Sequence, residues 1–595
     1  IMAVQRFTAE MVVEMLQKGL EDEDGIGPDS ESEISYTDND PAYVPQGQAV
    51  VMGESLLNEE DSSDDQEGSS DESSEEEIQT QSDRFRSYWN ENPPTHGRTK
   101  SHNILRSCPG PTPGSVAVSP KDAWDKFISD NIIEEVLECT NLEGRRAAAV
   151  KGKRWKSIDK EEFLALIGLT LLAGGDKSWD VALRVLFLDP LQNPIYKATM
   201  GVGRYENIRH FLRFDDRRTR ALRLETDHMA AFRYARECLL DNCRRHFIRS
   251  DCVTIDEQLV PFRGRFRFLQ YMPSKPAKYG LKIFWMCDAR VPYAIDGTVH
   301  TGRQPGEEIK KKLGETCAVG SEGQCNLFFP PIGRNITTDN FFASVSLTEK
   351  LLEKDLTIVG TLRQNKADIP PVMKPSKLRE IYSSEFGFRG NMTMVSYVPK
   401  KGKSVVLLST MHDDKAVDES NHKKKPDVIL FYNQKKGGVD IMDQMVSTYT
   451  CKQRTRRWPM VLWSNMLDVA TPNAYASFTS QHPGYRSGIS NARRLFIKEL
   501  GQELVMPHMK RHMESTPVLQ KPIVEAMGRC GIIKQNPGTT QPQEDIRQAG
   551  QGKRKRCAIC TTSKDRKASS WCFQCTRPVC KEHRHVVLIC EECMN

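Results

Sequence analysis

The sequence lacks any apolar run that approaches the roughly 20 residues a membrane-spanning helix needs. Its longest apolar stretch, FLALIGLTLLAGG at residues 163–175, is typical of a helix buried in a protein core. The first ten residues, IMAVQRFTAE, do not have the pattern of a secretory signal peptide. Hydrophobic residues are only 38% of the 595 residues, which still suffices for globular parts, and a chain of this length needs several domains. We therefore expect a multidomain protein with no membrane partner.

Basic residues are almost absent from the first 83 residues, which hold 24 acidic side chains but only Arg6 and Lys18 as basic ones. This segment has a net charge of −22, so the total of +5 leaves +27 on the rest of the chain. A strongly basic body predicts a polyanionic partner, and nucleic acid is the favoured one. The acidic segment is a solvated tail in the simplest interpretation; phosphorylation, or shielding of the basic body by mimicry of nucleic acid, are alternatives.

Cysteine is scarce before residue 557, because seven of the 17 cysteines fall in residues 557–595 and the others are scattered singly. Scattered cysteines indicate a reducing compartment and argue against a disulfide framework. The C-terminal segment instead has ligand pairs at C-x2-C or C-x2-H spacing, which suits one edge of a zinc tetrahedron. The four pairs are Cys557/Cys560, Cys572/Cys575, Cys580/His583 and Cys590/Cys593.

Eight ligands predict two structural Zn²⁺ ions, and a segment this short depends on metal for its folding energy. A cross-brace, as in RING and PHD fingers, would place Cys557, Cys560, Cys580 and His583 on one ion. Cys572, Cys575, Cys590 and Cys593 would then hold the second ion, but spacing alone leaves this pairing open. His585 is an alternative to His583, which the two-residue gap favours. The preceding KRKR, residues 553–556, is typical of a nuclear localisation signal or of a phosphate-binding patch. Both interpretations place the protein with DNA, and we expect it in the nucleus.

The first 117 residues include runs such as NEEDSSDDQEGSSDESSEEE, whose like charges prevent a core, and we expect them to be disordered. A helical pattern follows to residue 251, with Asp159 as a candidate helix cap. Within it, RYENIRHFLRFDDRRTRALR, residues 204–223, predicts a basic helix that either tracks phosphates or is simply solvated. From residue 252, short apolar runs that suit strands alternate with helical segments, which predicts an α/β core.

Residues 366–427 are polar and turn-rich around MTMVSYVPKKGKSVVLLST, a hairpin-like pair, and predict a β-rich insertion in this core. VILFYNQ, residues 428–434, is a short apolar run that we predict to be another strand. The segment RRWPMVLWSNMLDVATPNAYASF is again predicted to be helical. A polar linker, residues 535–552, precedes the cysteine-rich segment.

Aspartates occur where ordered segments are predicted to meet loops. Asp256 follows an apolar run, Asp339 lies in RNITTDNFFAS, and Asp440 follows a Gly-Gly pair with Asp443 one helical turn later. Carboxylates that converge at strand ends are the ligands Mg²⁺ prefers, and two such ions about 4 Å apart serve phosphoryl transfer. On spacing alone the signal is weak, because Asp is also common in turns and caps.

Six segments follow one another along the chain and together resemble the piggyBac family of DNA transposases: TIDEQLVPFRGR, YMPSKPAKYGLKIFWMCDA, NITTDNFFAS, LTIVGTLRQNK, YNQKKGGVDIMDQM and RRWPM. The resemblance is strongest over residues 252–470 and weaker over residues 119–595. It implies an RNase H-like catalytic core with an aspartate triad, two catalytic Mg²⁺ ions, and cut-and-paste transposition of double-stranded DNA at TTAA sites through hairpin ends. It also implies a homodimer, since two element ends must be held together.

The resemblance assigns roles to individual residues. Trp458 matches a family tryptophan near the DNA ends, although alone it would suit a core, and Arg363 and Lys366 match basic residues that face target DNA. The C-terminal segment matches a cysteine-rich cross-brace domain that binds transposon ends. The catalytic, metal-binding aspartates would be Asp256, Asp339 and Asp440, with Asp443 as the additional one.

The expected fold is therefore α/β, with helical, β-rich and zinc-binding parts around an RNase H-like core. The expected parts are a disordered acidic region (1–117), a helical dimerisation and DNA-binding domain (118–251 and 451–534), the catalytic core (252–365 and 428–450), a β-rich insertion (366–427), a linker (535–552) and the zinc-binding domain (553–595).

Three functions compete at this point. The favoured one is a Mg²⁺-dependent DNA transposase, an enzyme that cleaves and joins DNA strands. The second is a domesticated relative that binds DNA or chromatin without cutting it; all four aspartates are present, which favours the enzyme. The third is a C-terminal finger that acts as a ubiquitin ligase or reads histones.

Overall fold

The computed structural model describes residues 89–94, 108–302, 333–516 and 519–532, and parts of the C-terminal segment between residues 556 and 583. The chain divides into two compact units, residues 1–532 and 533–595. Among the described residues, no helix combines the length and the apolar character required to cross a membrane. Several predictions lie outside the described residues: the tail up to residue 88, the linker 535–552, Cys572, Cys575, His585, Cys590 and Cys593.

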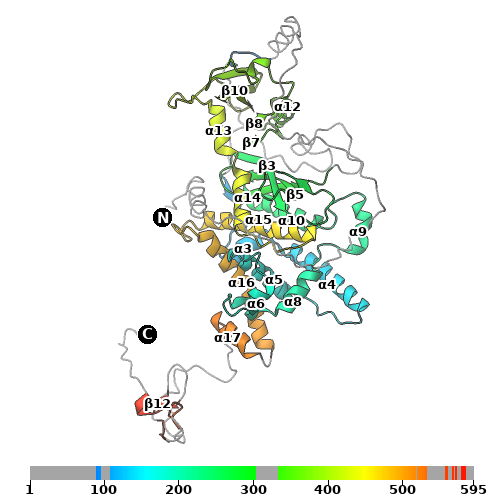
Figure 1. Ribbon diagram of the computed structural model, residues 1–595, viewed down its shortest axis with the longest axis vertical. Coiled ribbons are helices and arrows are strands. Elements are labelled where there is room, and N and C mark those ends of the chain that lie inside the picture. The colour runs from blue at the N-terminus through cyan, green and yellow to red at the C-terminus, as the bar shows by residue number, and fades with distance from the viewer. Residues whose placement is uncertain are drawn as a thin grey trace. The chain divides into compact units, whose positions relative to one another are not determined.

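The first unit contains a nine-stranded mixed sheet, which extends from β5 to β10 in Figure 1. Its strand order is β4-β5-β3-β7-β8-β11-β10-β9, and β6 also pairs with β5. Strand β7 is parallel to β3 and β8, while the other pairs are antiparallel. The strands are β3 (Cys252–Pro261), β4 (Gln270–Tyr271), β5 (Tyr279–Asp288), β6 (Ala294–Val299), β7 (Asn335–Thr338), β8 (Thr357–Leu362), β9 (Ser384–Arg389), β10 (Met392–Lys400) and β11 (Lys403–Ser409).

The predicted insertion contributes strands to the same sheet. The hairpin prediction is confirmed, because β10 and β11 pair antiparallel from Thr393↔Ser409 to Lys400↔Lys403. Strand β11 then pairs with β8, with Leu362 opposite Val406, so the insertion extends the core sheet at its edge. The mixed α/β fold expected from the alternation of apolar strands and helices is thus observed.

VILFYNQ is helical, so the predicted strand was wrong. It lies in α13 (Asp427–Lys435), which begins after Pro426. Only Val428 and Ile429 of this helix are buried, as on a helix packed along one side. A short apolar run does not by itself distinguish a strand from a helix, and the flanking Pro-Asp was the signal for a helix start.

Helices pack on the sheet and form most of the rest of the first unit (Figure 1). Asp159 caps α5 as predicted, because its carboxylate accepts the Glu162 N–H at 2.9 Å. Helix α15 is buried all round from Pro459 to Phe478, and contacts α3, α10 and α14. The longer helices are α4 (Asp130–Val150), α5 (Lys160–Gly175), α8 (Val202–Phe211), α10 (Arg233–His246), α14 (Gly438–Thr448), α15 (Trp458–Gln481) and α16 (Ala492–Ser515); the shorter ones are α3 (Pro120–Asp125), α6 (Leu183–Leu188), α7 (Ile195–Thr199), α9 (Arg217–Leu224), α12 (Val345–Leu352) and α17 (Lys521–Arg529).

Two further predictions needed correction. The single basic helix expected at residues 204–223 is two helices, α8 and α9, separated by residues 212–216. Part of the region up to residue 117 is ordered: Trp89 is 5% exposed and its neighbour Asn90 pairs with Phe388 of β9. Strand β1 (Gly110–Pro111) likewise pairs with β2 (Phe247–Ile248). The prediction of disorder rested on the composition of the whole region, which does not reveal short segments that pair with the folded part.

Candidate active site

The register between β3 and β7 brings the first carboxylates together. Asp256 lies inside β3, not at its end as the sequence suggested. Strand β7 runs parallel to β3 and ends at Thr338, which is paired with Ile255. Asp339, the residue after β7, therefore lies beside the stretch of β3 that continues past this end. Three carboxylate oxygens, one each from Asp256, Glu257 and Asp339, lie within 4.8 Å of one another.

Backbone and lysine contacts hold these carboxylates in place. Asp256 accepts the Glu257 N–H at 2.7 Å, and Asp339 accepts the Phe341 N–H at 3.0 Å. The Lys282 ammonium lies 3.9 Å from a Glu257 oxygen and over the rings of Phe284 and Phe341, 4.9 and 4.7 Å from their centroids. The Lys275 ammonium donates to the Glu257 carbonyl at 3.2 Å, so two lysines lie beside the larger negative charge of the site.

Helix α14 presents the other two predicted aspartates. Asp440 is exposed in its first turn, and Asp443 follows one turn later, half-buried. Gly437 and Gly438 lie at the short junction between α13 and α14, and neither has a positive φ. A Cβ on Gly438 would lie 3.0 Å from both the Asp288 carbonyl oxygen and Thr254 Oγ1. Gly438 therefore allows α14 to approach β3 closely.

Burial and like charge raise the pKa values of the acidic groups. Burial, then Glu257 and Asp339, then Asp440, raise the pKa of Asp256 to about 8. Burial and Glu257 raise the pKa of Asp339 to about 6. Burial also raises the pKa of Asp443, and Asp440 adds to this effect. Asp440 and Asp443 are both outside the 4.8 Å cluster. The charge of Asp440 acts on Asp256 and on Asp443, and Asp443 is hydrogen-bonded to Gln258 of β3, so α14 presents its two aspartates beside the strand that carries Asp256.

Such a group of desolvated carboxylates fits divalent cations. Each carboxylate opposes the ionisation of the next, and a cation of charge +2 relieves this repulsion. The donors are all oxygen atoms, which suits Mg²⁺. The chemistry of the donor set therefore matches the ion that the sequence suggested.

Sequence reasoning missed several residues of this neighbourhood, among them Glu257 and Tyr432. Glu257 follows Asp256 on a strand, where successive side chains point to opposite faces, so the pattern did not join them. Tyr432 lies in α13, which was interpreted as a strand; its pKa is raised by burial and by the charges of Asp339, Asp256 and Asp440. Only the tertiary structure brings these side chains to the aspartates.

The three predicted DNA-contacting residues are not members of the carboxylate cluster. Arg363 is exposed directly after β8, and Lys366 donates from its ammonium to the Ala343 carbonyl. Trp458 is the first residue of α15, half-buried against Phe266 with ring centroids 5.2 Å apart. No described contact tests their predicted roles.

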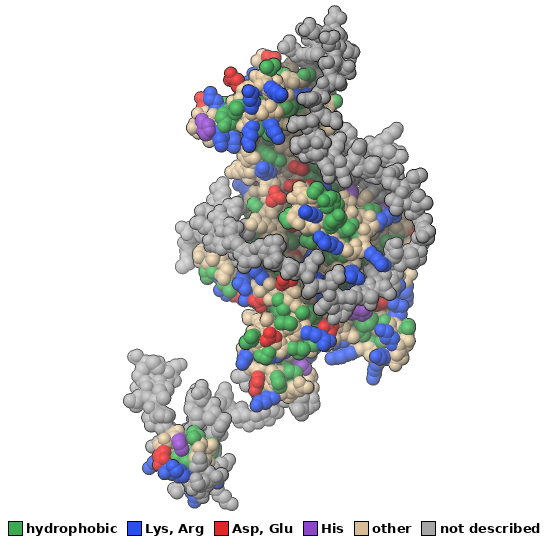
Figure 2. Space-filling model, in the orientation of Figure 1, with side chains coloured by type: hydrophobic (Ala, Val, Ile, Leu, Met, Phe, Trp, Pro, Cys, Tyr) green, Lys and Arg blue, Asp and Glu red, His purple; other side chains and the backbone are tan. Residues whose placement is uncertain are grey.

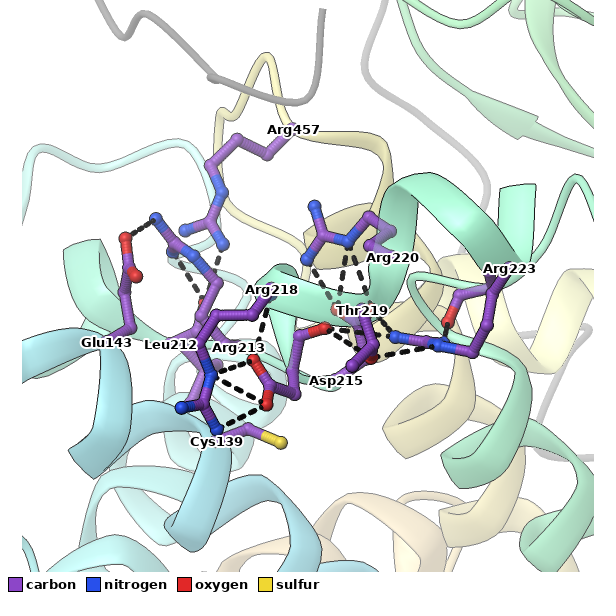
Figure 3. Close-up of polar contacts among 12 residues, drawn as sticks. Cys139, Glu143, Leu212, Arg213, Asp215, Arg218, Thr219, Arg220, Arg223 and Arg457 are labelled. Carbon is purple, nitrogen blue, oxygen red and sulfur yellow. Dashed lines mark hydrogen bonds and ion pairs between the residues drawn. The ribbon is translucent and has the colours of Figure 1, made fainter. Parts of the chain in front are cut away.

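Arginines connect α8, α9 and the start of α15 (Figure 3). Arg457, which precedes Trp458, donates to the carbonyls of His210 and Leu212 at 3.1 and 2.5 Å. Arg220 and Arg223 both donate to the buried Asp215. These guanidinium groups therefore serve the fold, so the basic pattern of this region does not by itself mean phosphate binding.

The C-terminal unit gathers Cys557, Cys560, Cys580 and His583, whose ligand atoms lie within 4.8 Å of one another. Tetrahedral Zn²⁺ with bonds of about 2.3 Å to sulfur and 2.0–2.1 Å to nitrogen requires edges of about 3.8 Å and about 3.6 Å. The Sγ atoms of Cys560 and Cys580 are 3.7 Å apart, and His583 Nδ1 lies 3.4–3.7 Å from the three sulfurs. These four residues are the first set of the expected cross-brace, and their geometry fits zinc.

Known proteins identify the class to which this chain belongs. The family model described as Transposase IS4 matches residues 119–475, more than half of the sequence, and the chain belongs to this family of transposases. Within it, the relatives are of the piggyBac type, as the sequence resemblance predicted. A solved piggyBac transposase synaptic complex with hairpin DNA has a TM-score of 0.65 and 32% identity, covering 82% of this chain and all of the solved chain.

Two human relatives agree with this identification. PiggyBac transposable element-derived protein 3 of Homo sapiens is 24% identical over 368 residues, which are 58% of this chain and 58% of the relative. PiggyBac transposable element-derived protein 2 of Homo sapiens is 22% identical over 385 residues, 61% of this chain and 62% of the relative. The chain thus spans about three fifths of the length of these relatives.

Proposed function

We propose that this protein is a Mg²⁺-dependent DNA transposase that excises and integrates a transposon by a cut-and-paste reaction. The observation that carries the proposal is the convergence of Asp256 and Asp339 from β3 and β7 with Asp440 and Asp443 from α14. Membership of the transposase family supports the reaction class. By resemblance to the piggyBac family, the target is TTAA and the excised element passes through hairpin ends.

The reaction we propose consists of phosphoryl transfers at the ends of the element. Water attacks a phosphodiester and frees a 3′-OH; this oxygen then attacks the opposite strand, forms a hairpin and releases the flanking DNA. After the hairpin is hydrolysed, the 3′-OH attacks a target phosphodiester, so each step forms one P–O bond and breaks one. Two Mg²⁺ ions would supply Lewis acidity and charge neutralisation.

The protein's own residues hold these reactants. Asp256 and Asp339, with Asp440 and Asp443 from the facing helix, would bind the two ions. Lys282, whose ammonium lies over two aromatic rings and near Glu257, partly offsets the charge of the carboxylates when the ions are absent. The half-buried aromatic face of Trp458 and the basic groups Arg363 and Lys366 would contact DNA.

Other parts of the proposal follow from charge and resemblance. Exposed Lys400, Lys401 and Lys403 lie at the β10–β11 turn, and basic side chains are frequent over this part of the molecule (Figure 2). They suit a DNA partner. We propose an RNase H-like core, a homodimer that holds two DNA ends, a nuclear location, and a C-terminal unit in which two Zn²⁺ ions stabilise a surface for element ends.

A cleavage assay tests the proposal. A labelled duplex that carries an element end flanked by TTAA is incubated with protein and Mg²⁺, and nicked and hairpin products are separated on a denaturing gel. Asp256→Ala should reduce both products by at least about a thousandfold, because the ion loses a ligand. Asp251→Asn is the matched control: it lies just before the same strand, pairs with Arg290 and contacts no member of the site.

The outcomes separate the two functions. Products that depend on Asp256 support the transposase. Binding of the duplex without any product, in the presence of Mg²⁺ or Mn²⁺, would favour a domesticated DNA-binding protein, and equal cleavage by wild type and Asp256→Ala would reject the proposed centre.

A further inference from the structure

Gln258 is a buried side chain of β3 that connects one carboxylate of the site to the protein core. Its Nε2 donates to Asp443 Oδ1 over 2.7 Å. Its Oε1 accepts from Trp285 Nε1 at 2.9 Å and from Asn465 Nδ2 at 3.1 Å. Gln258 is 1% exposed, Trp285 3% and Asn465 5%. Four elements, β3, β5, α14 and α15, thus meet at one amide.

The orientation of the Gln258 amide follows from the chemistry of its partners. The indole N–H of Trp285 can only donate, so the amide oxygen must face it. The amide nitrogen is then directed to Asp443, whose ionised carboxylate can only accept. Asn465 occupies the remaining acceptor direction of the same oxygen, so a flipped amide would leave buried donors unsatisfied. The amide therefore has a single favourable orientation.

Trp285, which sets this orientation, is itself held in place. Trp285 lies on β5, where it is paired with Asp256 of β3 on one side and with Gly297 of β6 on the other. A Cβ on Gly297 would lie 2.5 Å from Trp285 Cε3, so the ring occupies the space that any larger residue there would fill. The network starts at a rigid ring and ends at Asp443.

We propose that Gln258 is a positioning residue for Asp443. It holds one carboxylate oxygen and leaves the other free for a divalent cation, and its N–H opposes the repulsion that Asp440 exerts on Asp443. Metal ligands commonly depend on such outer hydrogen bonds for their orientation. This inference rests on the proposed function, because it assumes that Asp443 binds the ion.

Gln258→Glu tests the proposal with little change of shape. The new carboxylate still accepts from Trp285 and Asn465 but places an oxygen against Asp443, which should turn away. We expect the Mg²⁺ concentration for half-maximal cleavage to rise by about 10- to 100-fold, the usual effect of losing an outer-shell partner. The rise in melting temperature caused by Mg²⁺ alone should shrink in parallel.

A double-mutant cycle separates positioning from a merely structural role. In the Asp443→Asn background the new amide donates to the carboxylate of Gln258→Glu, so the hydrogen bond returns with reversed polarity. The double variant should regain melting temperature relative to Gln258→Glu, yet bind Mg²⁺ no worse than Asp443→Asn alone. Additive losses of Mg²⁺ affinity would overturn the proposal.

Two further variants keep the test decisive. Asn473→Asp is the matched control, a buried amide of the same helix as Asn465 that bonds to Ala294 and Cys243 and should leave the Mg²⁺ dependence unchanged. If Gln258→Glu does not fold, Trp285→Phe keeps an aromatic ring, although a smaller one, and removes the N–H that orients Gln258. It should raise the Mg²⁺ requirement in the same direction, and an unchanged requirement would overturn the proposal.

Failure of this inference differs from failure of the proposed function. A wild-type protein that neither cleaves DNA nor is stabilised by Mg²⁺ or Mn²⁺ refutes the function. A wild type that does both, with a Gln258→Glu variant of the same Mg²⁺ dependence, refutes the positioning role alone.

Discussion

At the residue scale, neighbouring side chains of β3 reach one site from opposite faces of the sheet. Asp256 and Gln258 share the face covered by α14, while Glu257 points to the face of Lys282. Strand β7 ends at Thr338, opposite Ile255, and the next residue, Asp339, brings a carboxylate oxygen within 4.8 Å of both Asp256 and Glu257. A cation bound here would therefore be stabilised by carboxylates from both faces of the sheet.

Glu257→Gln should separate stability from metal binding. Removing one of the crowded charges lowers the pKa of Asp256 and should stabilise the metal-free protein by about 1 kcal/mol, since one pKa unit is worth about 1.4 kcal/mol. The added stability from Mg²⁺ should fall, because one negative charge is lost. Thermal unfolding with and without Mg²⁺ measures both effects.

The matched control is Glu349→Gln, whose carboxylate pairs with Arg389 away from the site and should leave the Mg²⁺ response unchanged. A Glu257→Gln protein with the full response to Mg²⁺ would show that this carboxylate plays no part in cation binding.

At the element scale, the position of α14 on β3 decides where Asp440 and Asp443 lie. The helix contacts the strand at Gly438, whose absent side chain leaves room for Thr254 and the Asp288 carbonyl. Thr254 Oγ1 also donates to the Lys435 carbonyl at 2.7 Å, at the end of α13. A displacement of about 1 Å here would move both carboxylates, and such shifts are costly in catalysis.

The adjacent glycines provide a paired experiment. Gly438→Ala should destabilise the protein by about 1–3 kcal/mol and reduce cleavage by about a hundredfold, because the new methyl group pushes α14 from β3. At Gly437 the nearest atom to a new Cβ would be Ile441 Cδ1 at 3.8 Å, an ordinary contact. Chemical denaturation and the cleavage assay compare the two; equal effects of both substitutions would contradict this account of the packing.

At the scale of the whole molecule, the two units are stabilised by different means. The first has an extensive hydrophobic core that continues from the sheet into the helices. The described part of the second contains two short strands, β12 (Ser570–Trp571) and β13 (Pro578–Val579), and a cysteine–histidine tetrahedron. A unit of this size can bury only a small apolar core, so we expect bound metal to supply much of its folding energy.

Zinc removal should therefore affect the second unit alone. Metal analysis of the purified chain should find two Zn²⁺ ions, and Cys560→Ala should remove one of them without changing the main thermal transition of the first unit. Cys530→Ala, at the end of α17, replaces a free half-buried cysteine and should leave the zinc content unchanged. Loss of the main transition in Cys560→Ala would contradict independent stabilisation of the two units.

By itself the sequence determined the mixed α/β class, the Asp159 helix cap, the β10–β11 hairpin and the cluster of Cys557, Cys560, Cys580 and His583, because these depend on local periodicity and spacing. It also determined the transposase family, because ordered blocks of residues carry that identity. Only the tertiary structure decided that Glu257, Gln258 and Tyr432 join the aspartates, and that VILFYNQ is a helix. The reason is that a short apolar run fits either element, and that strand register and helix packing, which sequence periodicity does not encode, determine which distant side chains meet.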